Sequence, residues 1–554
     1  MKDQDYRLNP EHPPLAKALA ALPLVLDKKI KGPEANWSWS GINQWESGWY
    51  MLYHAGNDPV QILFLARLPM MLLMVLLGAL LYIWAARLYG RKVGLIVLTL
   101  YAFYPDVLAH GRLVTTDVPA ALGFLVAVMT FDKAIRQKTW KTTIFAALGF
   151  ALAQLMKFSA ILLFLIFLIL AIVRTILDRK ETGGFWPGFW SNFKTYFWVC
   201  FLSVIAVWAV YIPFVWKMPA SIEHQVIENN LTADPRTLFL RNFLHHFENN
   251  PITRALGHYI LGIFLVIGRV GGGNVTFILG KLSEKTIRWY FPVAWLLKTS
   301  IPVIVLFAST ILALALRWTK KKEAKWTIAL LLTPILVYWA FTLAGSLNIG
   351  IRHLMPTVPF VLLLIGYGIY PIISNYKKSK AMFFVVIALV VYMVASTLSN
   401  YPNFISYFNE ITPKSIRYER LMDSSLDWGQ DMMRLKKYID DNKISSIKVD
   451  YFGGSVPSYF ISQSHDWHSG CGPTKGWIAI SATFYQSSKL VGPKEGKWSY
   501  AWLDKYKPKA IIGGSILVFD ITADDYAKNP PSMSYPITKY DYCLQNSDTG
   551  QVGF

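Results

Sequence analysis

Long apolar segments recur along the first 400 residues of this chain, and they constrain its fold more than any other feature. A helix crosses the hydrocarbon core of a bilayer with about 20 residues, within a range of about 17–25. Ten runs reach or approach that length, near 66–86, 93–109, 114–133, 143–157, 158–174, 196–217, 299–317, 327–345, 354–372 and 381–399. The fourth and fifth runs are short and adjacent, and one re-entrant pair is an alternative for them. The pattern predicts an α-helical polytopic membrane protein with about ten transmembrane helices.

Charge is distributed as a membrane topology requires. Only 16% of the residues are charged, whereas about 25% is usual in soluble domains. Lys and Arg gather after every second run, at residues 87–92, 133–141, 174–194, 317–325 and 377–380. These loops are cytoplasmic by the positive-inside rule. The net charge of +21 is therefore topological, and without a basic stripe interleaved with aromatic residues we expect no nucleic-acid partner.

This topology divides the chain into three parts. Residues 1–60 form a first external loop, and residues 61–399 form the transmembrane region with a large external loop at 218–298. Residues 400–554 are more polar and predict a small external α/β domain. Its expected strands are Ile447–Phe452, Trp477–Thr483 and Ala510–Ile521, and its expected helices are Asp427–Asp440 and Tyr500–Tyr506.

Two details of the external domain bear on its chemistry. Asp427 precedes a predicted helix and is expected to cap it, while carbohydrate binding is the alternative for the Asp427-Trp428-Gly429-Gln430-Asp431 motif. Cys471 and Cys543 could form a disulfide in an oxidising compartment, although two cysteines alone do not show that they are close.

A dense polar motif, Asn9-Pro10-Glu11-His12-Pro13-Pro14-Leu15, lies at the start of the chain. Its prolines fix φ and lack amide donors, so the motif neither continues a helix nor enters a sheet. A rigid backbone of this kind would hold Glu11 and His12 in fixed directions. A simple proline-rich entry to the helix around Ala16–Leu26 is the alternative.

Other polar residues gather at the same predicted outer face. They are His110, Arg112 and Asp117 in one hairpin, Lys157 in the next turn, and Arg352 and His353 before the ninth run. A transporter would place polar groups near the bilayer midplane on broken helices. The middles of these runs contain few polar residues. The pattern favours an enzyme at the outer leaflet over a lipid or solute transporter. A non-catalytic scaffold that binds glycans is a third alternative.

The large external loop contains an amphipathic stretch at Thr237–Asn249, which predicts a lid helix or a helix in the interfacial plane. His245 and His246 lie in this stretch and are expected on the lid surface. The chain contains no clustered Cys/His zinc spacing, no P-loop and no Rossmann fingerprint.

Taken in order, the motifs resemble the GT-C membrane glycosyltransferases of glycosyltransferase family 39, which include the dolichyl-phosphate-mannose–protein mannosyltransferases. The closest similarity is to uncharacterised bacterial members. The resemblance rests on Tyr6–Leu15, Ala109–Asp117, Trp289–Pro292 with Lys298, Gly350–Pro356 and Asp427–Asp431. Each motif is modest, but the ordered set covers nearly the whole chain.

The resemblance implies transfer of a sugar from a polyprenyl-monophosphate donor to a protein hydroxyl or envelope glycan, normally with inversion, in the cytoplasmic membrane of a prokaryote. Asp117 and Glu11 are the candidate catalytic carboxylates, and Glu11 resembles a position that binds a divalent metal or orients the acceptor in some members. Cations must hold the leaving phosphate, and the candidates are Arg352, His353, Lys298 and Lys157. The candidate acceptor- or sugar-binding residues are His12, His110 and Arg112.

One departure from the family concerns the first outer loop. Family members carry an Asp-Glu pair about twenty residues before the Asn-Pro-Glu-His-Pro-Pro segment, after a preceding span, and the Asp serves as general base. Asp3 and Asp5 are too close to the motif to be that pair. We therefore expect an N-terminally truncated sequence, and a natural inactive paralogue is the alternative.

Overall fold

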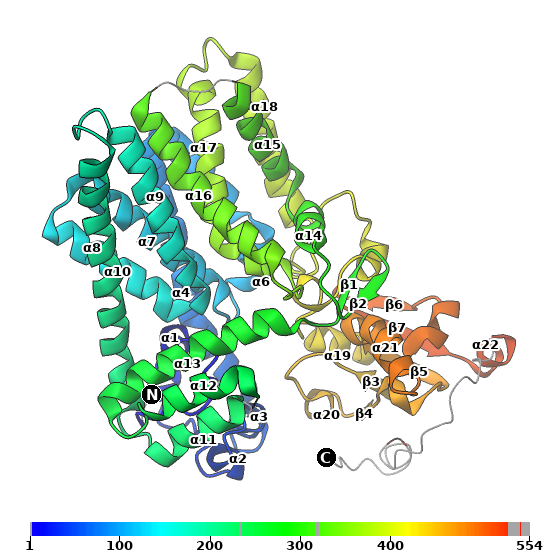
Figure 1. The fold of residues 1–554 in the computed structure, drawn as a ribbon. Helices are drawn as coiled ribbons and strands as arrows, with labels where there is room; N and C mark the ends of the chain where they lie inside the picture. The colour runs from blue at the N-terminus through cyan, green and yellow to red at the C-terminus, as the bar shows by residue number, and fades with distance from the viewer. Residues whose placement is uncertain (1–2, 232–233, 317–320, 530–542, 544–554) are drawn as a thin grey trace. The chain divides into compact units, whose positions relative to one another are not determined.

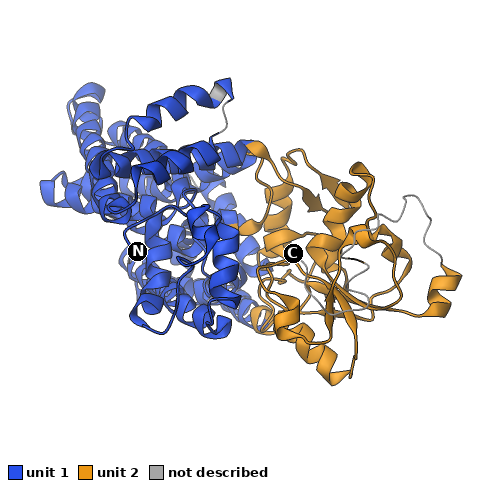
Figure 2. Cartoon of the chain, turned by 90° about the horizontal axis from the view of Figure 1, so that it is seen from below, with its two compact units in different colours: residues 1–271, 301–344, 353–395 blue, residues 272–300, 345–352, 396–554 orange. Residues whose placement is uncertain are grey.

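The computed structural model describes residues 3–231, 234–316, 321–529 and 543. Two compact units make up the chain (Figure 2). Unit 1 consists of residues 1–271, 301–344 and 353–395, and unit 2 of residues 272–300, 345–352 and 396–554. The tail expected at 400–554 thus forms a unit together with two segments that interrupt the hydrophobic region.

Helices form nearly all of unit 1 (Figure 1). Those of its first half are α1 (Pro14–Leu26), α2 (Trp37–Ser40), α3 (Gln44–Tyr53), α4 (Pro59–Tyr89), α5 (Arg91–Ala102), α6 (Pro105–His110), α7 (Asp117–Gln137), α8 (Trp140–Met156) and α9 (Leu162–Asp178). They are followed by α10 (Phe185–Val215), α11 (Ala220–Asn230), α12 (Pro235–His245), α13 (Pro251–Gly272), α15 (Ile301–Leu316), α16 (Lys322–Ala344), α17 (Val358–Ser374) and α18 (Lys380–Leu398). A polytopic helical membrane fold with a small C-terminal sheet region is confirmed.

The number of spans differs from the expected ten. Among the described residues, eight helices are long and apolar enough to cross a membrane, or nine if α14 (Tyr290–Lys298) and α15 count as one broken span. The run expected at 93–109 is two helices, α5 and α6, separated at Phe103 and Tyr104 just before Pro105. The 12 residues of α5 rise about 18 Å, well short of a hydrocarbon core about 30 Å thick.

Helix α13 passes the same test although it lies in the expected external loop. In Figure 1 it runs across the ends of the bundle helices of unit 1. Its hydrophobic cluster reaches only the last turns of its neighbours, at Ala151 and Leu155 of α8 and at Val207, Tyr211 and Val215 of α10. Helix α13 therefore caps the bundle together with α11 and α12, and the helix expected in Thr237–Asn249 is α12. We call α11, α12 and α13 the cap.

Several ion pairs mark one end of unit 1. At the end remote from the cap, Arg136 pairs with Asp132 and Glu323, Arg174 pairs with Asp178, and Lys322 pairs with Asp178 and Glu181. This basic end contains the Lys and Arg loops that the positive-inside rule assigns to the cytoplasm. The opposite end holds the Asn9–Leu15 motif, and we call it the motif end.

A five-stranded sheet forms the core of unit 2, with strand order β4-β3-β5-β7-β6. The strands are β3 (Ile447–Asp450), β4 (Ser464–Asp466), β5 (Gly476–Ser481), β6 (Ala510–Ile512) and β7 (Ile516–Ile521). β3 is parallel to β4 and β5, whereas β7 is antiparallel to β5 and β6. The run expected at Ala510–Ile521 is therefore a hairpin. A two-stranded ribbon of β1 (Thr276–Ile278) and β2 (Lys281–Ser283) belongs to the same unit.

The remaining helices of unit 2 are short. They are α14, α19 (Met432–Asp441), α20 (Pro457–Phe460), α21 (Ala482–Lys494) and α22 (Ala523–Lys528). The expectation that Asp427 caps a helix is wrong, because α19 begins at Met432 and its N-cap is Asp431, which makes no side-chain cap bond. The helix starts later because a turn with Gly429 at φ 67° intervenes, a conformation that favours glycine.

Candidate functional site

The Asn9–Leu15 motif forms a turn that leads into α1. Asn9 adopts a positive φ of 59°, and Pro14 occupies the first helical position, where its missing N–H costs nothing. The Asn9 amide donates to Glu11 Oε1 at 2.7 Å and to Gln44 Oε1 at 2.6 Å. Gln44 in turn donates to Glu11 Oε1 at 3.1 Å. Two amides therefore orient one oxygen of the Glu11 carboxylate.

Lys17 of α1 stabilises this turn through hydrogen bonds to Asn9. Its ammonium donates to the carbonyl oxygen of Asn9 at 2.8 Å and to Asn9 Oδ1 at 3.0 Å. Burial lowers the pKa of Lys17 to about 7, with the charge of Glu11 acting in the opposite direction. Lys17 is thus a cation that titrates near neutral pH beside the motif.

Asp117 and Lys157 form a buried ion pair at the same end of unit 1. Lys157 Nζ lies 2.6 Å from Asp117 Oδ1, and the side chains are 13% and 0% exposed. Asp117 is the first residue of α7, and Lys157 directly follows α8. The positive N-terminus of α7 favours the negative charge of Asp117, and the negative C-terminus of α8 favours the positive charge of Lys157.

His12 connects the motif with this ion pair. The charges that act on its imidazole include those of Lys17 and Glu11 on the motif side and those of Lys157 and Asp117 on the other. Its own carbonyl oxygen accepts a hydrogen bond of 2.5 Å from the Tyr6 hydroxyl. We call Glu11, His12, Lys17, Asp117 and Lys157 the motif-end cluster.

The cap covers the motif through α13. A Cβ atom added to Gly262 would lie 2.7 Å from the carbonyl oxygen of Pro10 and 2.3 Å from the Phe158 ring, so only glycine allows this close approach. Nearby, the ring of Tyr6 lies 5.2 Å from that of His258. The cap and the N-terminal segment are therefore packed as one structure.

The hairpin residues lie on the segment that leads into Asp117. His110 closes α6 and is 1% exposed, and Arg112 follows in the turn at a half-buried position. The structure keeps both residues at the motif end, and their role in binding acceptor or sugar stays a prediction.

In unit 2, Arg352 is held in place from two sides. Its Nε donates to Ser424 Oγ at 2.9 Å, and its guanidinium lies 4.4 Å from the centre of the Trp428 ring. Ser424 itself donates to the carbonyl oxygen of Ile349 at 2.7 Å. Trp428, which the sequence suggested for sugar contact, therefore supports an arginine. His353 is the first residue of the following segment of unit 1 and is half-buried.

Lys298 has surroundings that differ from those of a phosphate ligand. It is 1% exposed, and its ammonium donates to the carbonyl oxygens of Ile405 and Ser425 at 2.7 Å each. These bonds tie the end of α14 to the segments around Ile405 and Ser425 in unit 2. The geometry favours a structural role for Lys298 over the predicted role in donor binding.

Asp427 is a buried carboxyl group in the same unit. It is 1% exposed and accepts from the backbone N–H groups of Gly429 and Thr483, each at 3.4 Å. Burial raises the pKa of Asp427 to about 8, although these hydrogen bonds act in the opposite direction. The group is therefore mainly protonated at neutral pH.

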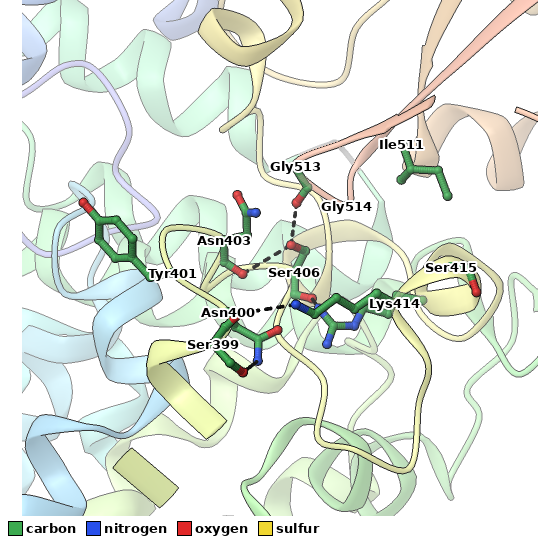
Figure 3. Close-up of a pocket in the computed structure, with 11 residues that line it drawn as sticks. Ser399, Asn400, Tyr401, Asn403, Ser406, Lys414, Ser415, Ile511, Gly513 and Gly514 are labelled. Carbon is green, nitrogen blue, oxygen red and sulfur yellow. Dashed lines mark hydrogen bonds between the residues drawn. The ribbon is translucent and has the colours of Figure 1, made fainter. Parts of the chain in front are cut away.

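A cavity of about 300 Å³ opens in unit 2 between the segment after α18 and the β6–β7 turn (Figure 3). The two positively charged side chains that line the cavity bind backbone carbonyl oxygens. Lys414 donates to that of Ser399, and Arg417 donates to those of Ser406 and Phe408. Ser406 bridges to the Gly513 carbonyl oxygen at 2.6 Å. These bonds stabilise the junction of the loop and the hairpin.

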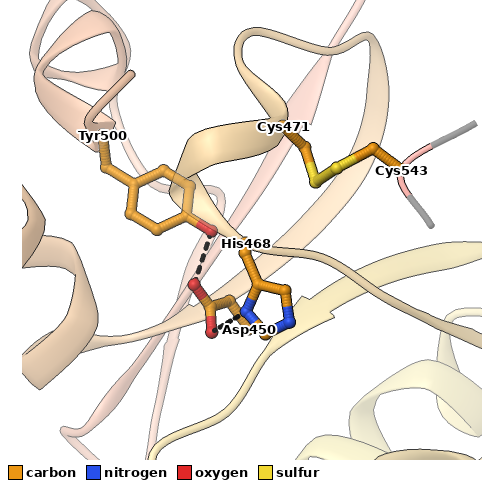
Figure 4. Close-up of a disulfide and its surroundings, with 5 residues drawn as sticks. All are labelled: Asp450, His468, Cys471, Tyr500 and Cys543. Atoms are coloured by element: carbon orange, nitrogen blue, oxygen red, sulfur yellow. Dashed lines mark hydrogen bonds and ion pairs between the residues drawn. A yellow bond between two sulfur atoms is a disulfide. The ribbon is translucent and has the colours of Figure 1, made fainter. Parts of the chain in front are cut away.

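A disulfide joins Cys471 and Cys543, with 5.6 Å between the Cα atoms (Figure 4). Beside it, Asp450 accepts from the Tyr500 hydroxyl at 2.7 Å and faces His468 at 3.7 Å. The pairing that the sequence left open is present in the structure.

Several members of the site could not be selected from the sequence. Gln44 lies 33 residues from Glu11 in the chain and carries no motif of its own. Lys17 had a weak signal, a single cation inside the otherwise apolar α1. The contact between Gly262 and Pro10 depends on the crosswise position of α13, which hydropathy alone does not show.

A comparison with protein families finds similarity over part of the chain. A family model described as dolichyl-phosphate-mannose-protein mannosyltransferase matches residues 61–184. This stretch contains Asp117 and Lys157 as well as α4 to α9. No curated protein matches the chain.

Proposed function

We propose that this chain is a membrane glycosyltransferase that moves a sugar from a polyprenyl-monophosphate donor to a hydroxyl group of a protein or an envelope glycan. The observation that carries the proposal is the motif-end cluster, in which two carboxylates and two lysines gather at one end of a membrane bundle. The family match over residues 61–184 includes two of these residues.

The reaction needs a base for the acceptor hydroxyl, and Glu11 is suited to this role. Asn9 and Gln44 hold its Oε1, while its Oε2 accepts no hydrogen bond within the described part of the chain. As the acceptor oxygen bonds to the anomeric carbon, its proton passes to Glu11. A base positioned in this way contributes about 10²–10⁴ in rate.

The second requirement is a cation for the leaving group. The bond from the anomeric carbon to the phosphate oxygen breaks, the oxygen keeps the electron pair, and polyprenyl phosphate departs. Lys157 is our candidate for that oxygen, and Asp117 fixes its direction through the 2.6 Å contact. His12, His110 and Arg112 are the candidates for sugar or acceptor. Attack opposite the leaving phosphate gives inversion.

Arg352 and His353 are further candidates for the donor phosphate. The anchoring of the Arg352 guanidinium by Ser424 and Trp428 supports this role, because a fixed planar fork matches phosphate oxygens. A divalent metal at Glu11 would add a second charge at the base.

The disulfide and the charge asymmetry support an orientation. Disulfides persist in oxidising compartments, so unit 2 belongs outside the cytoplasm, and the basic end of unit 1 faces the cytoplasm. The motif end would then meet donor and acceptor at the outer leaflet of a prokaryotic plasma membrane.

The test is a transfer assay with the purified full chain, polyprenyl-monophosphate mannose as first donor, and released polyprenyl phosphate as readout. Glu11→Gln and Lys157→Met should each lower turnover at least about 100-fold. Glu46→Gln, a carboxylate change in the first turn of α3, is the matched control and should retain activity. Movement of the donor across vesicles without release of phosphate would instead indicate a transporter.

A further inference from the structure

Two histidines and two glutamates meet on the cap, apart from the motif-end cluster. His224 and Glu228 lie on α11, His245 ends α12, and Glu248 follows in the next turn. One nitrogen of each histidine and a carboxylate oxygen of Glu248 all lie within 4.8 Å of one another. The sequence signal for this group is weak, because His224 is far in the chain from its partners.

The three ligand atoms already converge. Glu248 Oε2 lies 3.2 Å from His224 Nδ1 and 2.9 Å from His245 Nδ1. A tetrahedral zinc ion with bonds of about 2.0–2.2 Å separates its ligand atoms by about 3.4 Å. The imidazole rings of His224 and His245 stack with 4.4 Å between their centres and a tilt of 27°. Two positively charged imidazolium rings would repel each other at this distance.

Glu228 faces the ring nitrogen of His245 that points away from Glu248. It lies 3.0 Å from His245 Nε2 and also pairs with Nε of Arg241 at 2.6 Å. A carboxylate at Nε2 accepts the N–H of that nitrogen, so Nδ1 is the nitrogen that a metal would bind. Metal-bound histidines usually donate their other N–H to a carboxylate in this manner.

We infer that His224, His245 and Glu248 bind a divalent cation of the zinc type, with Glu228 as the carboxylate behind His245. Two imidazoles and one carboxylate form a protein ligand set known for zinc, and a water molecule completes the tetrahedron. The bound ion replaces the protons on the two Nδ1 atoms and ties α11 to α12. His224 is 53% exposed, which gives the ion a path from solvent. The inference is independent of the proposed transfer reaction.

The experiment is zinc titration of the full chain by calorimetry after removal of metals with a chelator. We expect one zinc ion per chain, with proton release on binding. His224→Ala and His245→Ala should weaken binding at least tenfold. Glu228→Gln should weaken it about 10–100-fold, because it changes only the hydrogen bond behind the ligand.

His246→Ala is the matched control. His246 is the exposed neighbour of His245, and its Nδ1 faces the carbonyl oxygen of Asn242 at 2.8 Å, so its removal should leave zinc affinity unchanged. Since His224 is exposed, its variant should keep the thermal unfolding midpoint of the metal-free protein. Absence of zinc binding, or equal loss in the His224 and His246 variants, would overturn the inference. The readout does not depend on transfer, so an inactive protein that binds zinc would refute only the proposed function.

Discussion

The ion pair between Asp117 and Lys157 gives the sharpest test of the site, because its stability and its chemistry respond differently to the same substitutions. Asp117 is fully buried, and Lys157 is 13% exposed. Lys157→Met leaves a carboxylate without its cation in the interior, which costs about 3–5 kcal/mol of unfolding free energy. Asp117→Asn keeps a polar partner for a lysine that still reaches solvent, so we expect a loss of about 1–3 kcal/mol.

The double variant separates structure from function. Removing both charges leaves no buried ion, so Asp117→Asn with Lys157→Met should be more stable than Lys157→Met alone, with a coupling of about 1–3 kcal/mol. Transfer should nevertheless remain at least about 100-fold below wild type in all three proteins, because the cation for the leaving phosphate is absent or misplaced.

Two measurements on each purified variant in detergent decide the outcome: the thermal unfolding midpoint and the rate of polyprenyl phosphate release. Asp178→Asn is the control, since Asp178 binds Lys322 and Arg174 at the basic end and should affect stability without a comparable loss of transfer. If the double variant regained activity together with stability, the pair would be structural and its assignment to the site would be refuted.

Three further predictions concern the cap and unit 2. Gly262→Ala forces a Cβ against Pro10, so it should lower the unfolding free energy by about 1–3 kcal/mol and lower transfer. Gly268→Ala in the same helix has open space around its Cβ and should change neither; equal thermal midpoints of the two variants would contradict the close packing of α13. Asp427 keeps its proton up to pH about 8 in the folded state but loses it near pH 3.8 when unfolded, so stability falls as pH rises between these values; Asp427→Asn should flatten this profile in thermal unfolding scans, and an unchanged slope would count against the assignment. Cys471→Ser removes a disulfide that spans 72 residues and should lower the unfolding free energy by up to about 4 kcal/mol. The thermal midpoints of variant and wild type are compared with and without reductant, and equal midpoints in all four samples would show that the disulfide contributes nothing.

The length of the apolar runs is sufficient to predict the class of fold. Long apolar runs such as 66–86 and 381–399 became α4 and α18, because membrane insertion depends on length and composition. The run at 93–109 failed as one span because Pro105 starts a new helix. Helix α13 was not predicted, because residues 251–272 fall inside the expected external loop. Its length and composition are those of a span, but its contacts run across the ends of α8 and α10.

The candidate site was predicted in part. Glu11, His12, Asp117 and Lys157 were selected from the sequence, and the structure brings them into one electrostatic environment. Lys298 was selected because of its charge, yet its ammonium binds backbone carbonyl oxygens. A motif shows which charged residues a segment carries. The partner of each side chain depends on tertiary contacts between distant segments, such as the contact of Gln44 with Glu11.

The central claim is that the motif-end cluster transfers a sugar from a lipid phosphate. Its most direct test is single-turnover transfer by the purified chain, in which sugar on the acceptor and free polyprenyl phosphate are counted together. We expect equal amounts of both products from the wild type and neither from Glu11→Gln above background. Full transfer by Glu11→Gln would contradict the assignment of the base, and wild-type protein that binds the donor without forming either product would contradict the proposed function.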